Sequence, residues 1–340
     1  MSKMVIGKKR VEFRIAEEKD IPEILALLKS GLGENVTPKT EAYWRWKHIQ
    51  NPFGPSHVLL AVSNDTIIGV RSFMRWQWRL GNEILEAVRG VDTVIKPEYQ
   101  GNGLFGELTL KLVDESFQYG YDFLYSTPNE KSKRGYQRLG WNQIGVLPIS
   151  VKLVKPWQVF LNLVTRPGKP DVGGAADQSL ERFLSRADLP SLLLASHRNF
   201  PEKLVTAHTV DSLQWRYAEV PVGSYFAFGV ERLGALKGLC FCRVKRTVAG
   251  MELRITDIFV EHLKYHEDLR RELRDVIRER KIHYVTSGCF GANDILSGWL
   301  LIKKKRLGPV VTARNIKLKN LKTLNEFSDW SPSLGDLELF

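Results

Sequence analysis

The chain of 340 residues lacks any apolar run long enough to cross a membrane, and it has little cysteine. A membrane-spanning helix needs about 20 predominantly apolar residues, so we expect no membrane span. The N-terminal residues lead into Lys8-Lys9-Arg10 without the apolar core of a secretion signal. These absences exclude the membrane-spanning and signal-bearing classes and predict a cytoplasmic protein.

The three cysteines are Cys240, Cys242 and Cys289, an odd number set among apolar residues. This pattern favours reduced core thiols over a disulfide framework, and metal ligation is the remote alternative. We predict that Cys240 and Cys242, on a strand, point to opposite faces. We therefore expect neither a disulfide nor a metal site.

The composition is that of a globular protein with an excess of basic residues. Apolar residues make up 43% of the chain and charged residues 26%, which is typical of packed domains. The length exceeds one ordinary core and predicts two domains. The net charge of +12 suits an anionic partner such as coenzyme A, a nucleotide-sugar or RNA, unless it reflects only a basic surface.

One stretch combines a strand, a glycine turn and a helix. Residues 88–95 are rich in β-branched side chains and are followed by Pro97, which predicts a strand. Apolar residues recur at helical spacing from Leu104 until Gly120 ends the run. Between them, residues 100–105 read Gln-Gly-Asn-Gly-Leu-Phe. Unpaired N–H groups at the helix start, the helix dipole and the small glycines together predict an anion site.

The residues after this turn make the pattern more specific. Residues 122–128 predict another strand, and Asn129, Tyr136 and Gly140-Trp141 follow it. This order resembles the GNAT acetyltransferase superfamily, in which a Gln/Arg-x-x-Gly-x-Gly/Ala turn precedes a helix, a strand and Asn-x6-Tyr-x3-Gly-Phe. Phe105 and Trp141 depart from the pattern, because glycine or alanine and phenylalanine are usual there. Both changes leave the backbone donors in place.

The resemblance implies the GNAT acyltransferase fold, an α+β class built as an α/β sandwich, with acetyl-coenzyme A as co-substrate. It implies that the strand backbone pairs with the pantetheine arm, that the turn binds the pyrophosphate, and that the start of the next helix contacts the coenzyme. The cofactor-binding residues expected on this basis are Thr93, Val94, Ile95, Gln100, Gly101, Asn102, Gly103, Leu104, Phe105, Gly106 and Asn129.

The resemblance also implies that Tyr136 gives a proton to the leaving thiolate. Acetyl transfer to an amine needs a neutral amine, a stabilised oxyanion and that proton. Asp92 is the second candidate catalytic residue, as a base or as a grip on the acceptor amine. However, Asp257 stands at the equivalent place in the second half, which favours a structural role for both. The base stays open among Asp92, Glu86, the C-terminal carboxylate of Phe340 and water.

The second half resembles the first without its chemistry. Trp215 lies 169 residues after Trp46, and Gly238 lies 169 residues after Gly69. The second half has no glycine turn at residues 263–268 and no tyrosine before Gly298-Trp299. We therefore predict a catalytic GNAT domain over residues 1–160, a linker over 161–178 and a degenerate GNAT-like domain over 179–340 for structure or acceptor binding.

The predicted function is N-acetyl transfer from acetyl-coenzyme A to a primary amine of a small acceptor, such as an amino sugar or nucleotide-sugar. One alternative is a tandem enzyme that uses aminoacyl-tRNA, and another is a non-catalytic acyl-coenzyme A-binding module. The intact turn favours coenzyme A. Nucleic acid is not expected, because the cations of residues 267–281 alternate with acids at salt-bridge spacing. The acceptor, the acyl chain length and the oligomeric state are not encoded in any motif.

Overall fold

The computed structural model describes residues 3–7, 9–33, 38–165, 178–288, 295–296, 302–304, 308–319 and 321–337. These residues form two compact units that are each discontinuous in sequence. The first comprises Met1–Trp78, Leu85–Gly145 and Val310–Asn325, and the second comprises Arg79–Ile84, Val146–Pro309 and Glu326–Phe340. The units cross the domain boundaries expected from the sequence, since residues 146–160 lie in the second unit and 310–325 in the first.

The first unit is a sheet with helices on both faces, in the strand order β1-β2-β3-β4-β5-β6-β15-β7. Neighbouring strands are antiparallel from β1 to β4, and β5 and β6 are parallel. The strands are β1 (Lys3–Ile6), β2 (Lys9–Ile15), β3 (His57–Ser63), β4 (Thr66–Leu80), β5 (Glu83–Ile95), β6 (Phe123–Ser126), β7 (Asn142–Val146) and β15 (Val310–Asn315). The helices are α1 (Ile21–Leu32), α2 (Glu41–His48), α3 (Leu104–Gln118), α4 (Glu130–Arg138) and α10 (Leu321–Asn325).

Alternation along the strands divides the interior of this unit into two cores. Leu59 and Ala61 of β3 pack with α3 and α4, whereas Val58 and Leu60 pack with α1 and α2. Successive strand residues point to opposite faces, so one strand contributes to both layers. Burying each such valine or leucine side chain contributes about 1.5–3 kcal/mol. The two cores hold the sheet rigidly between its helices.

The second unit is built on another mixed sheet, in the order β10-β11-β12-β13-β8-β14. Its strands are β8 (Ile149–Leu153), β10 (Phe226–Arg232), β11 (Ala235–Thr247), β12 (Gly250–Val260), β13 (Tyr284–Ser287) and β14 (Ile302–Lys304), with the short β9 (Leu204–Thr206) apart from them. Its helices are α5 (Pro156–Thr165), α6 (Gln178–Leu184), α7 (Leu189–Arg198), α8 (Val210–Leu213), α9 (His266–Glu279) and α11 (Leu334–Leu337).

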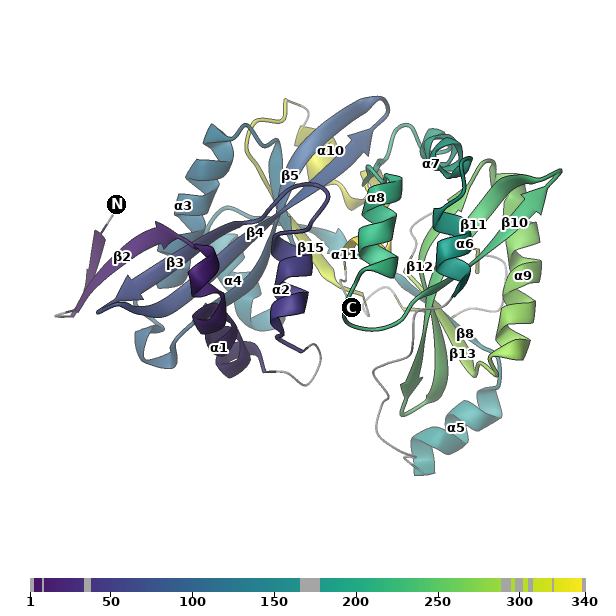
Figure 1. The fold of residues 1–340 in the computed structure, drawn as a ribbon, viewed down its shortest axis with the longest axis horizontal. Helices are drawn as coiled ribbons and strands as arrows, with labels where there is room; N and C mark the ends of the chain where they lie inside the picture. The colour runs from purple at the N-terminus through teal and green to yellow at the C-terminus, as the bar shows by residue number, and fades with distance from the viewer. Residues whose placement is uncertain are drawn as a thin grey trace. The chain divides into compact units, whose positions relative to one another are not determined.

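Each sheet contains a strand from the other half of the sequence. The late strand β15 pairs antiparallel with β6, and the early strand β8 pairs antiparallel with β13. In Figure 1, β15 is therefore yellow beside blue and teal strands, and β8 is teal beside green ones. The strands β6 and β13 also match in that each pairs parallel with its other neighbour. This exchange explains why neither unit is one continuous segment.

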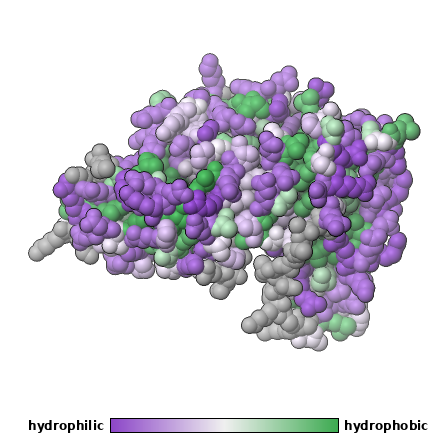
Figure 2. All heavy atoms as spheres, viewed as in Figure 1, coloured by the Kyte–Doolittle hydropathy of each residue, from purple (hydrophilic) through white to green (hydrophobic). Residues whose placement is uncertain are grey.

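The structure also bears on the expected absence of a membrane span and on the cysteines. The described chain contains no helix long and apolar enough to span a membrane, and hydrophilic residues cover most of the face shown in Figure 2.

Cys240 and Cys242 are free and buried. The prediction that they face opposite ways is wrong, because residues two apart on a strand lie on the same face, and their Sγ atoms are 3.5 Å apart.

Candidate active site

The glycine turn lies between the end of β5 and the first turn of α3. A short helix, η2 (Pro97–Tyr99), follows β5, and Gly101 and Gly103 then adopt φ of 78° and 80°. Positive φ is strained for side-chain-bearing residues. Gly103 is the N-cap of α3 and offers no side-chain cap, so the glycines are required by backbone conformation and leave the helix start uncapped.

Side chains predicted to bind the cofactor also shape this turn. The Gln100 amide donates to the Ile95 carbonyl at 2.9 Å, and the Asn102 amide donates to the carbonyls of Tyr99 and Gln100 at 3.2 and 3.1 Å. The first intrahelical bond is Glu107 N–H to Gly103 O at 3.1 Å. The N–H groups of residues 104–106 precede it and are oriented along the helix axis toward the turn.

The strand before the turn separates from its parallel neighbour. The register of β5 with β6 runs from Ala87–Phe123 to Arg89–Tyr125. The described pairing ends there, so Thr93, Val94 and Ile95 lie beyond the ladder. A strand edge freed in this way offers backbone groups to an extended ligand.

Tyr136 lies on α4 and faces the beginning of α3. Asn129 is the N-cap of α4, since its Oδ1 accepts from Ser132 N–H at 2.9 Å. The Tyr136 side chain is only 4% exposed, and its ring contacts Phe105 and Trp141 edge to face at centroid distances of 5.7 and 5.3 Å. The structure thus brings the predicted tyrosine to the predicted turn, with the atypical Phe105 and Trp141 packed around it.

Three polar groups converge beside Gly90 of β5. A Cβ at that position would lie 2.6 Å from Ser126 Oγ, 2.7 Å from Arg71 Nη2 and 2.8 Å from the Tyr136 hydroxyl. Arg71 Nη2 donates to that hydroxyl at 2.8 Å, and Ser126 Oγ is buried with no hydrogen-bond partner among the described residues. Only glycine leaves room for these three groups. Arg71 was missed by sequence reasoning, because no local motif marks it.

Asp92 lies in a buried cluster with two residues of α2. Its Oδ2 accepts from Lys47 Nζ at 2.5 Å and from His48 Nε2 at 2.9 Å, and His48 Nδ1 lies 2.9 Å from Ser56 Oγ. Asp92 adopts a positive φ of 39° within β5. The structure shows no contact between Asp92 and Tyr136, so the two predicted catalytic residues belong to separate clusters.

The charges of this cluster follow from burial and from its contacts. Burial opposes ionisation of Asp92, but the Lys47 ammonium and the His48 ring outweigh it and hold the carboxyl pKa below its usual range. Burial lowers the pKa of His48 despite the carboxylate, so the neutral ring donates from Nε2 and accepts from Ser56. A carboxylate whose proton affinity is lowered is a weak base.

The other candidate bases in the protein are Glu86 and the C-terminal carboxylate of Phe340. Glu86 accepts from Gln77 Nε2 at 2.7 Å, and its backbone N–H donates to Asp122 at 2.8 Å, near the start of the β5–β6 ladder. Phe340 lies outside the described residues. Trp44 and Trp46 of α2 are 5% and 2% exposed and therefore belong to the core.

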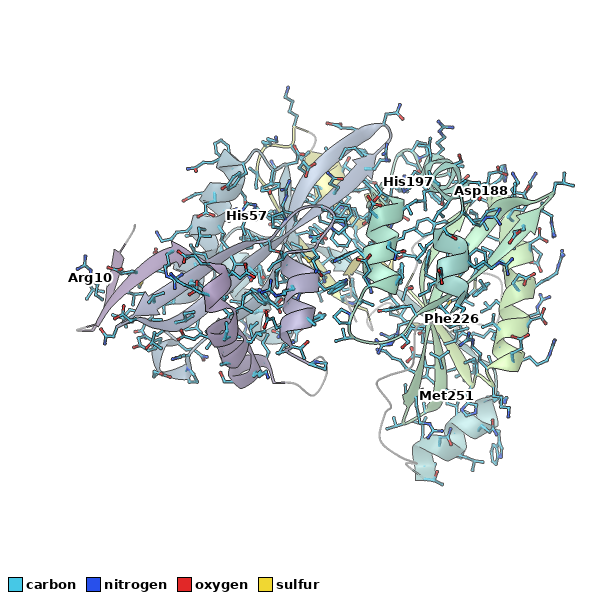
Figure 3. The ribbon with its side chains drawn as sticks, in the orientation of Figure 1. Arg10, His57, Asp188, His197, Phe226 and Met251 are labelled. Atoms are coloured by element: carbon cyan, nitrogen blue, oxygen red, sulfur yellow. The ribbon has the colours of Figure 1, made fainter. Side chains whose placement is uncertain are left out.

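A second cluster of titratable residues lies in the second unit. His208 Nε2 is 3.3 Å from Asp336 Oδ1 and 4.0 Å from Asp257 Oδ1, and the Tyr217 hydroxyl donates to Asp257. His208, Asp257 and Asp336 line a cavity of about 40 Å³, and His197 of α7, labelled in Figure 3, lines it too. Burial disfavours a charged His208, but the carboxylates raise its pKa. His208 and Tyr217 therefore compensate the two carboxylates, Asp257 and Asp336.

The basic stretches of the second unit are α9 and residues 303–306, which read Lys-Lys-Lys-Arg. On α9, Arg270, Arg271 and Arg278 form i,i+3 ion pairs with acids one turn earlier, which confirms the predicted salt-bridged face. The side chains of residues 303–306 lie outside the described residues, as does Gly298-Trp299. The predicted linker 161–178 is wrong at its start, because residues 161–165 belong to α5; residues 166–177 lie outside the described residues.

The comparisons with known proteins agree with this geometry. Residues 12–144 match the family model described as Acetyltransferase (GNAT) domain. No curated protein matches the sequence. Over residues 12–144 the chain is therefore similar to a GNAT acetyltransferase domain.

Solved structures share the fold over most of the chain. A GCN5-related N-acetyltransferase from Anabaena variabilis ATCC 29413 has a TM-score of 0.65 at 12% identity, covering 91% of this chain and 73% of its own. A conserved protein of unknown function from Enterococcus faecalis V583, described as a probable N-acyltransferase, has a TM-score of 0.65 at 11% identity. The match covers 92% of this chain and 74% of that protein's chain. A GCN5-related N-acetyltransferase from Kribbella flavida has a TM-score of 0.62 at 15% identity, covering 90% of this chain and 71% of its own.

At these identities the likeness concerns the fold alone. The predicted GNAT fold is confirmed, and the family match supports an acyltransferase.

Proposed function

We propose that this protein is an N-acetyltransferase that moves an acetyl group from acetyl-coenzyme A to a primary amine of a small acceptor. The observation that carries the proposal is the buried Tyr136 hydroxyl beside the first turn of α3, next to the edge of β5. A helix start that binds phosphate, a strand edge that pairs with an amide-containing arm, and an acid near their junction are the parts that thioester transfer needs.

The coenzyme is proposed to bind along these parts in order. The N–H groups of Leu104, Phe105 and Gly106 would hold the pyrophosphate, because they are uncapped and positively polarised. The backbone of Thr93 to Ile95 would pair with the pantetheine arm. Three cations on the adjoining helix α4 add favourable charge for the coenzyme phosphates: Lys133, Arg134 and Arg138.

The proposed reaction is direct transfer. The acceptor nitrogen forms a bond to the thioester carbonyl carbon, and the carbon–sulfur bond then breaks. The leaving sulfur takes the Tyr136 proton, and the acceptor nitrogen loses one to a base or to water. Because Asp92 is held by Lys47 and His48, we assign it first to positioning α2 against β5, and its role as a base stays a prediction.

We also propose that the second unit is a degenerate copy of the first. In each unit a buried tryptophan, Trp46 or Trp215, is followed two positions later by a side chain that donates to a strand aspartate. In the second unit, α9 has Glu267 and Asp268 in its first turn and no glycine turn before it. Acids at a helix start repel phosphate, so this unit would support the fold or the acceptor.

The experiment is a thiol-release assay with acetyl-coenzyme A and a panel of amino sugars, nucleotide-sugars and aminoglycosides. Wild type should release thiol with at least one amine, while Tyr136→Phe should retain binding and lose turnover. Thiol release that needs no amine would indicate hydrolysis instead. Transfer only from aminoacyl-tRNA would favour the tandem aminoacyltransferase, and tight binding without any turnover would favour an acyl-coenzyme A-binding module.

A further inference from the structure

Arg71 of β4 carries a charge that the described protein leaves unneutralised. The residue is 1% exposed, and among the described residues its guanidinium makes hydrogen bonds only to Tyr136 and Thr93 and no ion pair with a carboxylate. Its Nε is buried without a partner. Burying an uncompensated charge is costly, so such a cation needs a compensating group that forms or binds there.

The aromatic surroundings hold the guanidinium in place without neutralising it. Its central carbon lies 4.9 Å from the Phe73 ring centroid, 5.1 Å from that of Tyr136 and 5.5 Å from that of Phe105. Ring faces attract cations, but more weakly than a carboxylate does. The atypical Phe105 of the glycine turn is therefore also part of the Arg71 environment.

The direction of the hydrogen bond determines where the tyrosine proton goes. A guanidinium has donors and no acceptor, so Arg71 must donate and the Tyr136 oxygen must accept. The single O–H proton of Tyr136 then points away from Arg71. Gly90 leaves room for the hydroxyl, and among the described residues no group accepts its proton.

We propose that Arg71 is the positioning residue of Tyr136, which it orients for proton donation and whose phenolate it stabilises during transfer. This proposal rests on the proposed function. In the step, the Tyr136 O–H bond breaks, its proton bonds to the coenzyme thiolate, and the oxygen keeps the electron pair as phenolate. The Arg71 cation lies one hydrogen bond from that new charge. A proton from the acceptor ammonium, passed through solvent, restores the phenol.

The test uses Arg71→Met and Arg71→Lys, with Arg75→Met as the matched control. Arg75 lies on the same strand four residues later, and its guanidinium packs 5.7 Å from the Tyr121 ring centroid, away from Tyr136. Arg71→Met should lower kcat about 10- to 100-fold, the effect of losing a hydrogen bond to a charge. The KM for acetyl-coenzyme A should change less than threefold. Arg71→Lys should recover part of kcat, and Arg75→Met should match wild type.

A double-mutant cycle separates this role from a structural one. If Arg71 acts through Tyr136, then Arg71→Met combined with Tyr136→Phe loses no more kcat than Tyr136→Phe alone. Losses that multiply, or a change confined to KM or to thermal stability, would overturn the proposal. If wild type transfers acetyl normally and Arg71→Met is equally active, the Arg71 proposal is wrong while the proposed function stands. A wild type that transfers to no amine would overturn the proposed function with it.

Discussion

Replacing Asp92 by asparagine decides between a structural and a catalytic aspartate. The change keeps the side-chain size but leaves the Lys47 ammonium without a counter-ion. The Lys47 and Asp92 side chains are 6% and 11% exposed and 2.5 Å apart. Removing one partner of a buried pair costs about 3–5 kcal/mol, which is a large part of a typical unfolding free energy of about 5–15 kcal/mol.

The assay is urea unfolding followed by circular dichroism. A loss of about 4 kcal/mol at a slope of about 2 kcal/mol per molar moves the midpoint down by about 2 M. The control is Lys47→Met combined with Asp92→Asn, which removes the stranded charge and should be more stable than Asp92→Asn alone. The folded Asp92→Asn variant should keep kcat within about threefold of wild type, since a structural aspartate contributes little to the chemical step. Stability within 1 kcal/mol of wild type, together with a kcat loss of about 100-fold or more, would refute the structural assignment.

The same cluster predicts an acid dependence of stability. The pKa of Asp92 is lower in the folded protein than its ordinary value because Lys47 and His48 outweigh burial. A carboxyl of this kind stabilises the fold fully above its unfolded pKa of about 3.9, and the contribution is lost as the pH falls through its lower folded pKa. Unfolding free energy should therefore fall more steeply below about pH 4 in wild type than in Asp92→Asn. Equal slopes would contradict the argument.

Three further predictions concern the site and the second unit. Tyr136→Phe should lower kcat about 10²- to 10⁴-fold, as expected for loss of a general acid, with unchanged acetyl-coenzyme A affinity by calorimetry; unchanged kcat would exclude this acid. Gly90→Ala should reduce kcat at least about tenfold, because its Cβ would collide with the Arg71 and Tyr136 polar atoms; full activity would show that the space is unused. Dialysis against a chelator should leave thiol release unchanged, because the second-unit carboxylates are matched by His208 and Tyr217; loss restored by Zn²⁺ would instead indicate an ion beside His208.

Local features of the site were predictable from sequence, whereas long-range ones were not. Gly101, Gly103, Asn129 and Tyr136 each carry a local signal, namely a turn conformation, a helix cap or a fixed spacing after it. Arg71 carries none, since its meaning comes from three elements meeting at Gly90.

The fold shows the same division. The mixed class and most first-unit strands follow from strand alternation and turn residues such as Asn64 and Asp65, both at positive φ. The exchange of β8 and β15 depends on pairing between distant segments, which periodicity does not report. The register shift in the β11–β12 pairing, which skips Thr256 of β12, likewise depends on how two strands align.

The most direct test of the central claim is calorimetric titration of acetyl-coenzyme A into wild type and into a variant with Gly101 and Gly103 replaced by valine. The account predicts binding to wild type and loss of binding in the variant, because valine cannot adopt the positive φ that aims the α3 N–H groups at the pyrophosphate. Equal binding to both would place the coenzyme elsewhere. No binding to wild type would contradict the acetyltransferase itself.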